Sequence, residues 1–169
     1  STQSRGQGLG TTPGGDGVVW ADVPLRDLPM ENAALALQAY RWMGRPWVQA
    51  GIVQALLDTR ITGRLDRRVV HWRGKAVQLL LDVGHNPHAA QYLARRLATR
   101  PVAGRRLAVF GLLADKDLEG VLAPLLPLVD RWAVAPLHTP RSRSAEELAD
   151  ALTNHGATVK SYAGVAAAL

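Results

Sequence analysis

The 169-residue chain contains no cysteine. It can therefore form neither a disulfide nor a thiolate metal site, and this composition is compatible with a reducing compartment. It also lacks a signal peptide and any apolar run of about 18 residues, so the sequence predicts a cytoplasmic protein that does not enter a membrane. Aromatic residues make up only 5% of the chain and hydrophobic residues 47%, which predicts a core of leucine, valine and alanine.

Two catalytic signatures are missing as well. Neither a Gly-x-Ser-x-Gly nucleophile elbow nor a Gly-x-x-x-x-Gly-Lys-Ser/Thr phosphate loop occurs, so the chain cannot cradle a triphosphate with the backbone of such a loop. The glycine-rich stretch Gly6–Gly10 is not a dinucleotide loop, since no strand precedes it and no helix follows it. Residues 1–17 are instead predicted to form a flexible segment.

The chain has few acidic residues, 14 against 20 basic ones, which gives a net charge of +6. Arginine supplies most of the positive charge, and several arginines form scattered pairs: Arg67 with Arg68, Arg95 with Arg96, Arg105 with Arg106, and Arg141 with Arg143. No aromatic ladder accompanies these pairs, and no nucleic-acid-binding motif occurs. The sequence therefore favours a solvated arginine-rich surface that attracts anionic substrates over a nucleic-acid-binding protein.

The chain divides into two parts by its pattern. Residues 18–60 are predicted to hold a short strand over 18–23, a helix from about 29 or 31 to 43 and a second helix from about 46 to 58. Thr59–Gly63 has the composition of a connector, so a domain boundary is predicted there, with a second domain over 61–169.

Strands alternate with helices in this second domain. The first two strands are predicted to form a hairpin that turns at residues 73–75. Helices between the later strands imply parallel pairing, and hence a Rossmann-like α/β domain with a mostly parallel sheet and flanking helices. Residues 165–169 favour a last helix that is cut short, which suggests a fragment. Strands are predicted over 69–72, 76–83, 107–110, 132–135 and 157–159, and helices over 87–99, 118–125 and 145–154. The strands over 107–110 and 132–135 are predicted to be buried.

Several side chains mark where the helices begin and break. Asn86 and Asp117 are predicted N-caps, and Ser144 with Glu147 forms a capping box in which the glutamate reaches back to the serine N–H. Pro124 should kink or split the helix that contains it, because proline removes a donor and clashes with the preceding turn.

The most informative candidate site follows the apolar run Leu79–Leu81, which is predicted to be a fully covered strand. Asp82, His85 and Asn86 come directly after it and before a helix. Ligands bind at this carboxyl edge of open α/β sheets, beside positive helix ends. The alternative is a capped turn in which Asp82 only accepts backbone hydrogen bonds.

Three further candidates have equally plain alternatives. Asn32 could present its amide to a purine edge, or be an ordinary polar residue near a helix start. Arg64 could bind phosphate at the domain boundary, or be a surface arginine in a linker. Lys116 could pair with a substrate carboxylate or phosphate, or lie in a solvated loop. No metal site is predicted, since the histidines lack metal-ligand spacing.

Four segments together resemble the folylpolyglutamate synthase and dihydrofolate synthase branch of the Mur ligase superfamily. The Asp82-x-x-His85-Asn86-Pro87 element is the most specific part of the resemblance. The segments are Glu31–Leu37, Thr62–Leu65, Leu81–Pro87 and Phe110–Asp117.

The resemblance implies a larger enzyme with a central ATPase domain and a C-terminal Rossmann-like domain. Residues 18–60 would end the first domain, their helices weakly packed without it, and residues 61–169 would form most of the second. ATP would phosphorylate the carboxylate of dihydropteroate or folate, and the amine of L-glutamate would then attack the acyl phosphate. The ligands of Mg²⁺ are expected in the missing part. The fragment is expected to be inactive alone, and the protein a monomer.

The resemblance also implies roles for single residues. Asn32 would contact the adenine, Arg64 the ATP phosphates, and Asp82 the nucleotide at its ribose. His85 would line the cleft near the nucleotide and the incoming glutamate, where it is a candidate catalytic group, and Asn86 would shape the loop.

Two other interpretations stay open. Another Mur-type ligase, such as a peptidoglycan-precursor ligase, is disfavoured by the Asp115-Lys116-Asp117 segment and by the short spacing from Asn32 to Asp82. A free-standing α/β module could instead bind anions through the basic surface.

Lys116 is placed in the substrate cleft, although the resemblance implies no role for it.

Overall fold

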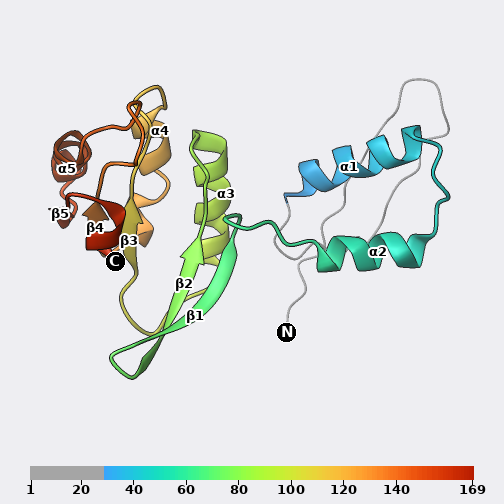
Figure 1. The fold of residues 1–169 in the computed structure, drawn as a ribbon, viewed down its shortest axis with the longest axis horizontal. Coiled ribbons are helices and arrows are strands. Elements are labelled where there is room, and N and C mark those ends of the chain that lie inside the picture. The colour runs from blue at the N-terminus through green and yellow to red at the C-terminus, as the bar shows by residue number, and fades with distance from the viewer. Residues whose placement is uncertain (1–28) are drawn as a thin grey trace. The chain divides into compact units, whose positions relative to one another are not determined.

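The computed structural model describes residues 29–169 (Figure 1). The glycine-rich segment over 1–17 and the strand over 18–23 lie outside the described residues. The chain divides into two compact units, one ending at Leu81 and the other beginning at Asp82. The domain boundary near residue 61 stays a prediction.

Two helices begin the described part of the first unit. Helix α1 spans Met30–Trp42 and helix α2 spans Gln49–Asp58, close to the predicted ranges. Each helix has one buried residue, Ala33 in α1 and Leu56 in α2. Packing of an apolar face supplies most helical stability in proteins, so these helices receive little of it from the described residues.

A β-hairpin completes this unit. Strand β1 (Asp66–Trp72) pairs antiparallel with β2 (Lys75–Leu81). The two turn residues, Arg73 and Gly74, both have positive φ, 49° and 74°. Positive φ at both residues is typical of two-residue hairpin loops, because such a turn follows the right-handed twist of the paired strands. The predicted hairpin and its turn are therefore confirmed.

The prediction that Leu79–Leu81 would be fully covered is wrong. Leu79 and Leu80 are only half-buried, and Leu81 is 36% exposed. Strand β2 also belongs to the two-stranded sheet with β1 and not to the parallel sheet. The antiparallel ladder satisfies its backbone, and among residues 29–81 no second layer covers it.

The second unit contains a three-stranded parallel sheet in the order β3-β4-β5. Its strands are β3 (Leu107–Phe110), β4 (Arg131–Val134) and β5 (Val159–Ser161). This arrangement confirms the Rossmann-like α/β class. The helices are α3 (Pro87–Ala98), α4 (Leu118–Leu122), the 3-10 helix η1 (Leu126–Leu128), α5 (Ala145–Asn154) and α6 (Val165–Ala168). The break between α4 and η1 falls at Pro124, as predicted.

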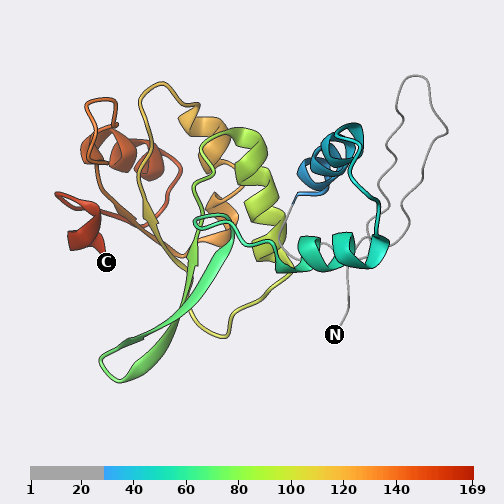
Figure 2. The same cartoon turned by 45° about the vertical axis from the view of Figure 1, so that its right-hand side comes forward.

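The core of this unit lies on one face of the sheet. Trp132 and Val134 of β4 are buried together with residues of three helices, including Val121, Leu148 and Leu152. The helices that meet there are α3, α4 and α5. Figures 1 and 2 both show α3 beside α4.

Strand β3 lies at the edge of the sheet, and its burial alternates. Ala108 and Phe110 pack against the core, whereas Leu107 is 67% exposed. The sequence predicted a buried strand here, which is wrong for Leu107 and Val109. Successive side chains of a strand point to opposite faces, and the core covers only one face of β3.

No helix among residues 29–169 is long and apolar enough to cross a membrane.

Candidate functional site

The loop after β2 carries three of the predicted site residues. The carboxylate of half-buried Asp82 accepts the Gly84 N–H at 2.7 Å. The side chain of Asn86 accepts the Ala89 N–H at 2.8 Å, with Pro87 at the first helical position of α3. The predicted cap is therefore confirmed, and the loop has the local hydrogen bonds that both interpretations of Asp82 allow.

His85 is exposed at the tip of this loop. Its Nδ1 lies 3.1 Å from the carbonyl oxygen of Val83. A carbonyl can only accept, so Nδ1 carries the hydrogen, and in the neutral ring Nε2 holds the lone pair. This contact leaves Nε2 as the proton acceptor of the neutral ring.

Gly84 is required by the close packing of the loop. A Cβ on Gly84 would lie 2.8 Å from an oxygen of Asp82 and 3.0 Å from the Cβ of Ala89. Both distances are tighter than ordinary van der Waals contact. The glycine therefore lets the Asp82 carboxylate lie directly against the start of α3.

A second loop, between β3 and α4, carries Lys116. The ammonium of Lys116 forms an ion pair with Asp115 at 2.8 Å, and its side chain is 29% exposed. The hydrogen bond from Lys116 lowers the pKa of the Asp115 carboxyl below its usual 3.8, with a smaller contribution from the charge of Arg141. The carboxylate of Asp117 accepts the Gly120 N–H at 2.9 Å and caps α4, as predicted.

The two loops come together where α3 and α4 begin. A Cβ on Gly120 would contact the Asp117 carboxylate and would lie 2.6 Å from Cγ of Pro87. The loop that holds Asp82 and the loop that holds Lys116 therefore lie side by side. Lys116 follows a strand of the parallel sheet, so this is the carboxyl edge where such sheets bind ligands.

A third loop, between β4 and α5, joins this edge. Leu113 and Ser142 form an isolated antiparallel bridge. The Ala114 N–H donates to the Arg141 carbonyl at 2.8 Å, and the Arg143 N–H donates to the Leu112 carbonyl at 2.9 Å. The 112–116 and 139–143 segments are thus fixed to each other by backbone hydrogen bonds.

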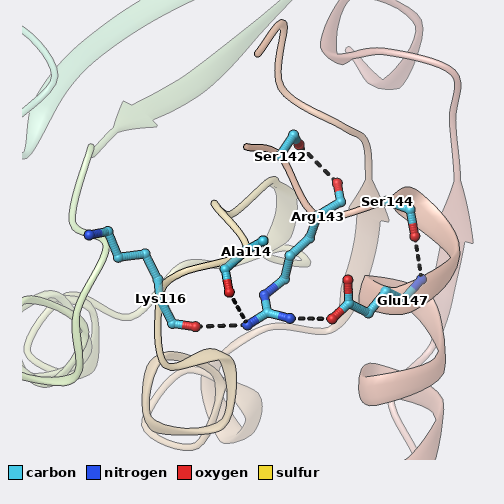
Figure 3. Close-up of polar contacts among 6 residues, drawn as sticks. All are labelled: Ala114, Lys116, Ser142, Arg143, Ser144 and Glu147. Carbon is cyan, nitrogen blue, oxygen red and sulfur yellow. Dashed lines mark hydrogen bonds and ion pairs between the residues drawn. The ribbon is translucent and has the colours of Figure 1, made fainter. Parts of the chain in front are cut away.

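Arg143 is the residue at this edge that the sequence interpretation missed. The sequence placed it with Arg141 on a solvated surface, but its side chain is only 16% exposed. Its guanidinium donates to the carbonyls of Ala114 and Lys116, each at 2.9 Å (Figure 3). The usable signal is that Arg143 follows a strand predicted to end at the same edge as Lys116.

Of the two hydrogen bonds predicted for the capping box at the start of α5, only one forms. The hydroxyl of Ser144 accepts the Glu147 N–H at 3.0 Å, which confirms the cap. The carboxylate of Glu147 pairs with Arg143 and not with the Ser144 N–H (Figure 3). In the pair with Arg143 both partners carry a charge, whereas a backbone N–H is a neutral donor.

Asn32 and Arg64 lie in the unit that ends at Leu81. Asn32 is exposed in the first turn of α1. Arg64 is exposed in the turn before β1, next to Gly63, whose φ is 72°. The assignment of both residues to ATP stays a prediction.

Within residues 29–169, no group of three or more histidine or acidic side chains could hold a metal ion.

The second unit is an α/β domain whose loops converge at the carboxyl edge of a parallel sheet. Residues 63–169 match the family model described as the Mur ligase, glutamate ligase domain. The chain belongs to this family.

Within this family, the similar proteins are named as dihydrofolate synthase/folylpolyglutamate synthases. The chain is 41% identical over 133 residues to the dihydrofolate synthase/folylpolyglutamate synthase of Escherichia coli K12. The aligned region covers 79% of this chain and 30% of that relative. Its fold is similar to that of Escherichia coli FolC in complex with DHPP and ADP, with a TM-score of 0.72, 39% identity, and coverage of 89% of this chain and 34% of that chain.

A further similar structure is a bifunctional folylpolyglutamate synthase/dihydrofolate synthase with Mn, AMPPNP and L-glutamate bound. It has a TM-score of 0.72, 38% identity, and coverage of 89% of this chain and 35% of that chain. The chain thus spans about a third of the length of the relatives it matches.

Proposed function

We propose that this chain is part of an ATP-dependent amide ligase that adds L-glutamate to dihydropteroate or to folate. Membership of the Mur ligase family and the names of the similar enzymes support this proposal. The observation that carries it is the adjacency of the Asp82–Asn86 and Asp115–Asp117 loops at the carboxyl edge of the second unit.

The proposed reaction has two steps. A carboxylate oxygen of dihydropteroate or folate attacks the γ-phosphorus of ATP, and ADP leaves. The amine of L-glutamate then attacks the acyl phosphate, an amide bond forms and inorganic phosphate leaves. The amine must lose its protons to a base, and Mg²⁺ held by other polypeptide would neutralise charge on the phosphates.

The residues of this chain bind and orient the reactants. Asp82 accepts hydrogen bonds from the ATP ribose, with Asn32 at the adenine and Arg64 at the phosphates. His85 accepts a proton through Nε2 from the glutamate ammonium, a role that its Nδ1 contact with Val83 supports.

Lys116 binds a carboxylate of L-glutamate in the proposed cleft. Its ammonium pairs with the carboxylate of Asp115. A carboxylate of L-glutamate has the same charge and the same oxygen acceptors, so it can take the place of Asp115 at the ammonium. Asn86 keeps the neighbouring loop in shape by capping α3.

The test joins this chain to the preceding part of its gene and measures ADP release. Dihydropteroate plus L-glutamate should stimulate release, and Asp82→Ala should reduce kcat/KM for ATP by about 10-fold or more, as loss of a charged hydrogen bond predicts. The chain alone should release none, because the phosphate loop is supplied by other polypeptide. A joined protein with no folate-dependent turnover would disprove the assignment.

The rival function is a non-catalytic anion-binding module, which the net charge of +6 favours. A polyanion that binds the chain alone, and is released by about 0.2 M salt, would support this rival if folate-dependent turnover were absent.

A further inference from the structure

The half-buried side chain of Arg143 is hydrogen-bonded to the backbone of the loop that carries Lys116. Its Nη2 lies 2.9 Å from the carbonyl oxygens of both Ala114 and Lys116, while its Nη1 pairs with Glu147 of α5. Its Nε is buried and has no hydrogen-bond partner within residues 29–169. The two terminal nitrogens therefore make all the polar contacts of this guanidinium.

The two carbonyls lie on either side of the peptide that joins Asp115 to Lys116. One charged donor thus fixes the peptide planes immediately before Asp115 and immediately after Lys116. The Lys116 N–H also donates to the Leu113 carbonyl at 3.2 Å. Together these bonds leave the backbone at Lys116 little freedom to rotate.

Fixing the backbone also sets the direction of the Lys116 side chain. Figure 3 shows that the Lys116 carbonyl points at Arg143, whereas its side chain extends the opposite way. Because the peptide groups around Lys116 are held by hydrogen bonds, its Cα–Cβ bond keeps one direction, from which the side chain extends to the ammonium. A side chain that must meet a substrate within about 0.5 Å needs such support from its neighbours.

We propose that Arg143 is a positioning residue for Lys116, and that it acts selectively on the binding of L-glutamate. The proposal rests on the function above, in which Lys116 binds a glutamate carboxylate. Arg143 itself does not touch substrate, so it acts only through the loop. Removing it should weaken glutamate binding and leave the ATP contacts of Asp82 and Arg64 in place.

The Glu147 carboxylate has a lesser role in this proposal. It pairs with the other terminal nitrogen of Arg143 and is itself half exposed, so water can take its place. The two bonds to the backbone carbonyls do not require it. Neutralising Glu147 should therefore leave Lys116 in position.

The experiment uses the chain joined to the preceding part of its gene. Arg143→Met should raise the KM for L-glutamate about 10-fold, with kcat and the KM for ATP within about 2-fold of the unmodified protein. Glu147→Gln should change the glutamate KM less than about 2-fold. The matched control is Arg105→Met, at an exposed arginine in the loop before β3, which should change none of these constants.

A double-mutant cycle separates positioning from general stability. Lys116→Met should raise the glutamate KM, and adding Arg143→Met to it should raise it little further, because Arg143 acts through Lys116. Additive effects of the two substitutions would overturn the proposal. So would equal losses of glutamate and ATP binding in Arg143→Met, since a merely structural role predicts both.

Amide exchange in the chain alone gives a readout that does not depend on turnover. Arg143→Met should speed exchange at the N–H groups of Ala114 and Lys116 by about 10-fold relative to Arg105→Met, and unchanged exchange would overturn the proposal. If the unmodified joined protein shows no glutamate-dependent turnover, or if Lys116→Met leaves its glutamate KM unchanged, the role of Lys116 in the proposed function fails. The exchange result then still decides whether Arg143 holds the loop.

Discussion

Gly84→Ala tests the geometry of the Asp82 loop directly. The added Cβ would meet the Asp82 carboxylate at 2.8 Å and the Cβ of Ala89 at 3.0 Å. The carboxylate is the more mobile of the two neighbours, because Ala89 belongs to α3. We therefore expect Asp82 to move and its 2.7 Å hydrogen bond with the Gly84 N–H to break.

The size of the effect follows from three contributions. A hydrogen bond to a charged acceptor contributes about 1.5–3 kcal/mol to stability, and overpacking against Ala89 adds about 1 kcal/mol of cost. Alanine restricts the unfolded chain and returns about 0.4–1 kcal/mol. The net loss in the free energy of unfolding should be about 2 kcal/mol.

Urea unfolding of the chain measures this loss. Trp132 is the only tryptophan from residue 82 onward and is buried in the core of the second unit, so its indole NMR signal reports on that unit. A loss of about 2 kcal/mol lowers the urea midpoint by about 1 M for a domain of this size.

Gly104→Ala is the matched control, because nothing lies within 4 Å of the Cβ it would add. It should leave the midpoint unchanged or raise it slightly. Equal midpoints for Gly84→Ala and Gly104→Ala would refute the close packing of Asp82 against α3. In the joined protein, Gly84→Ala should also raise the KM for ATP.

Three other predictions follow from the second unit. Leu148→Ala should cost about 3 kcal/mol of unfolding free energy, because Leu148 is fully buried in the core, whereas Leu107→Ala should cost less than about 1 kcal/mol; equal costs in urea unfolding would contradict the one-sided core. Ser144→Ala should cost about 1 kcal/mol by removing the N-cap of α5, which far-UV circular dichroism during thermal unfolding can follow, and no change in the unfolding midpoint would count against the cap. Lys116→Met should raise the pKa of Asp115 toward its usual 3.8, as a carboxyl ¹³C NMR titration would show. Because the folded-state pKa of Asp115 is lowered, the pair with Lys116 stabilises the fold above the unfolded pKa and loses this effect as the pH falls through the folded value.

The sequence located most of the local structure because those signals act over a few residues. Asn86, Asp117 and Ser144 each cap the helix that follows, and each bond spans three residues. The same holds for Pro124, which ends α4, and for Gly74 in the hairpin turn.

Burial was harder to predict, because an apolar run does not say which layer will cover it. Leu79–Leu81 and Leu107–Phe110 have the composition of covered strands, yet the first pairs only within a hairpin and the second lies at a sheet edge. Trp132 and Val134 of β4 are buried, since β4 is the central strand of its sheet. The position of a strand in its sheet therefore decides its exposure.

By itself, the sequence determined the order of strands and helices, their caps, and the Asp82-x-x-His85-Asn86-Pro87 element that marks the family, because each depends on neighbours in the chain. Only the tertiary structure decided which loops share the carboxyl edge and what Arg143 does there. The contacts of Arg143 with Ala114 and Lys116 join residues 29 and 27 positions apart. Such contacts exist only after parallel strands have brought their ends to one edge, so no local pattern around Arg143 could predict them.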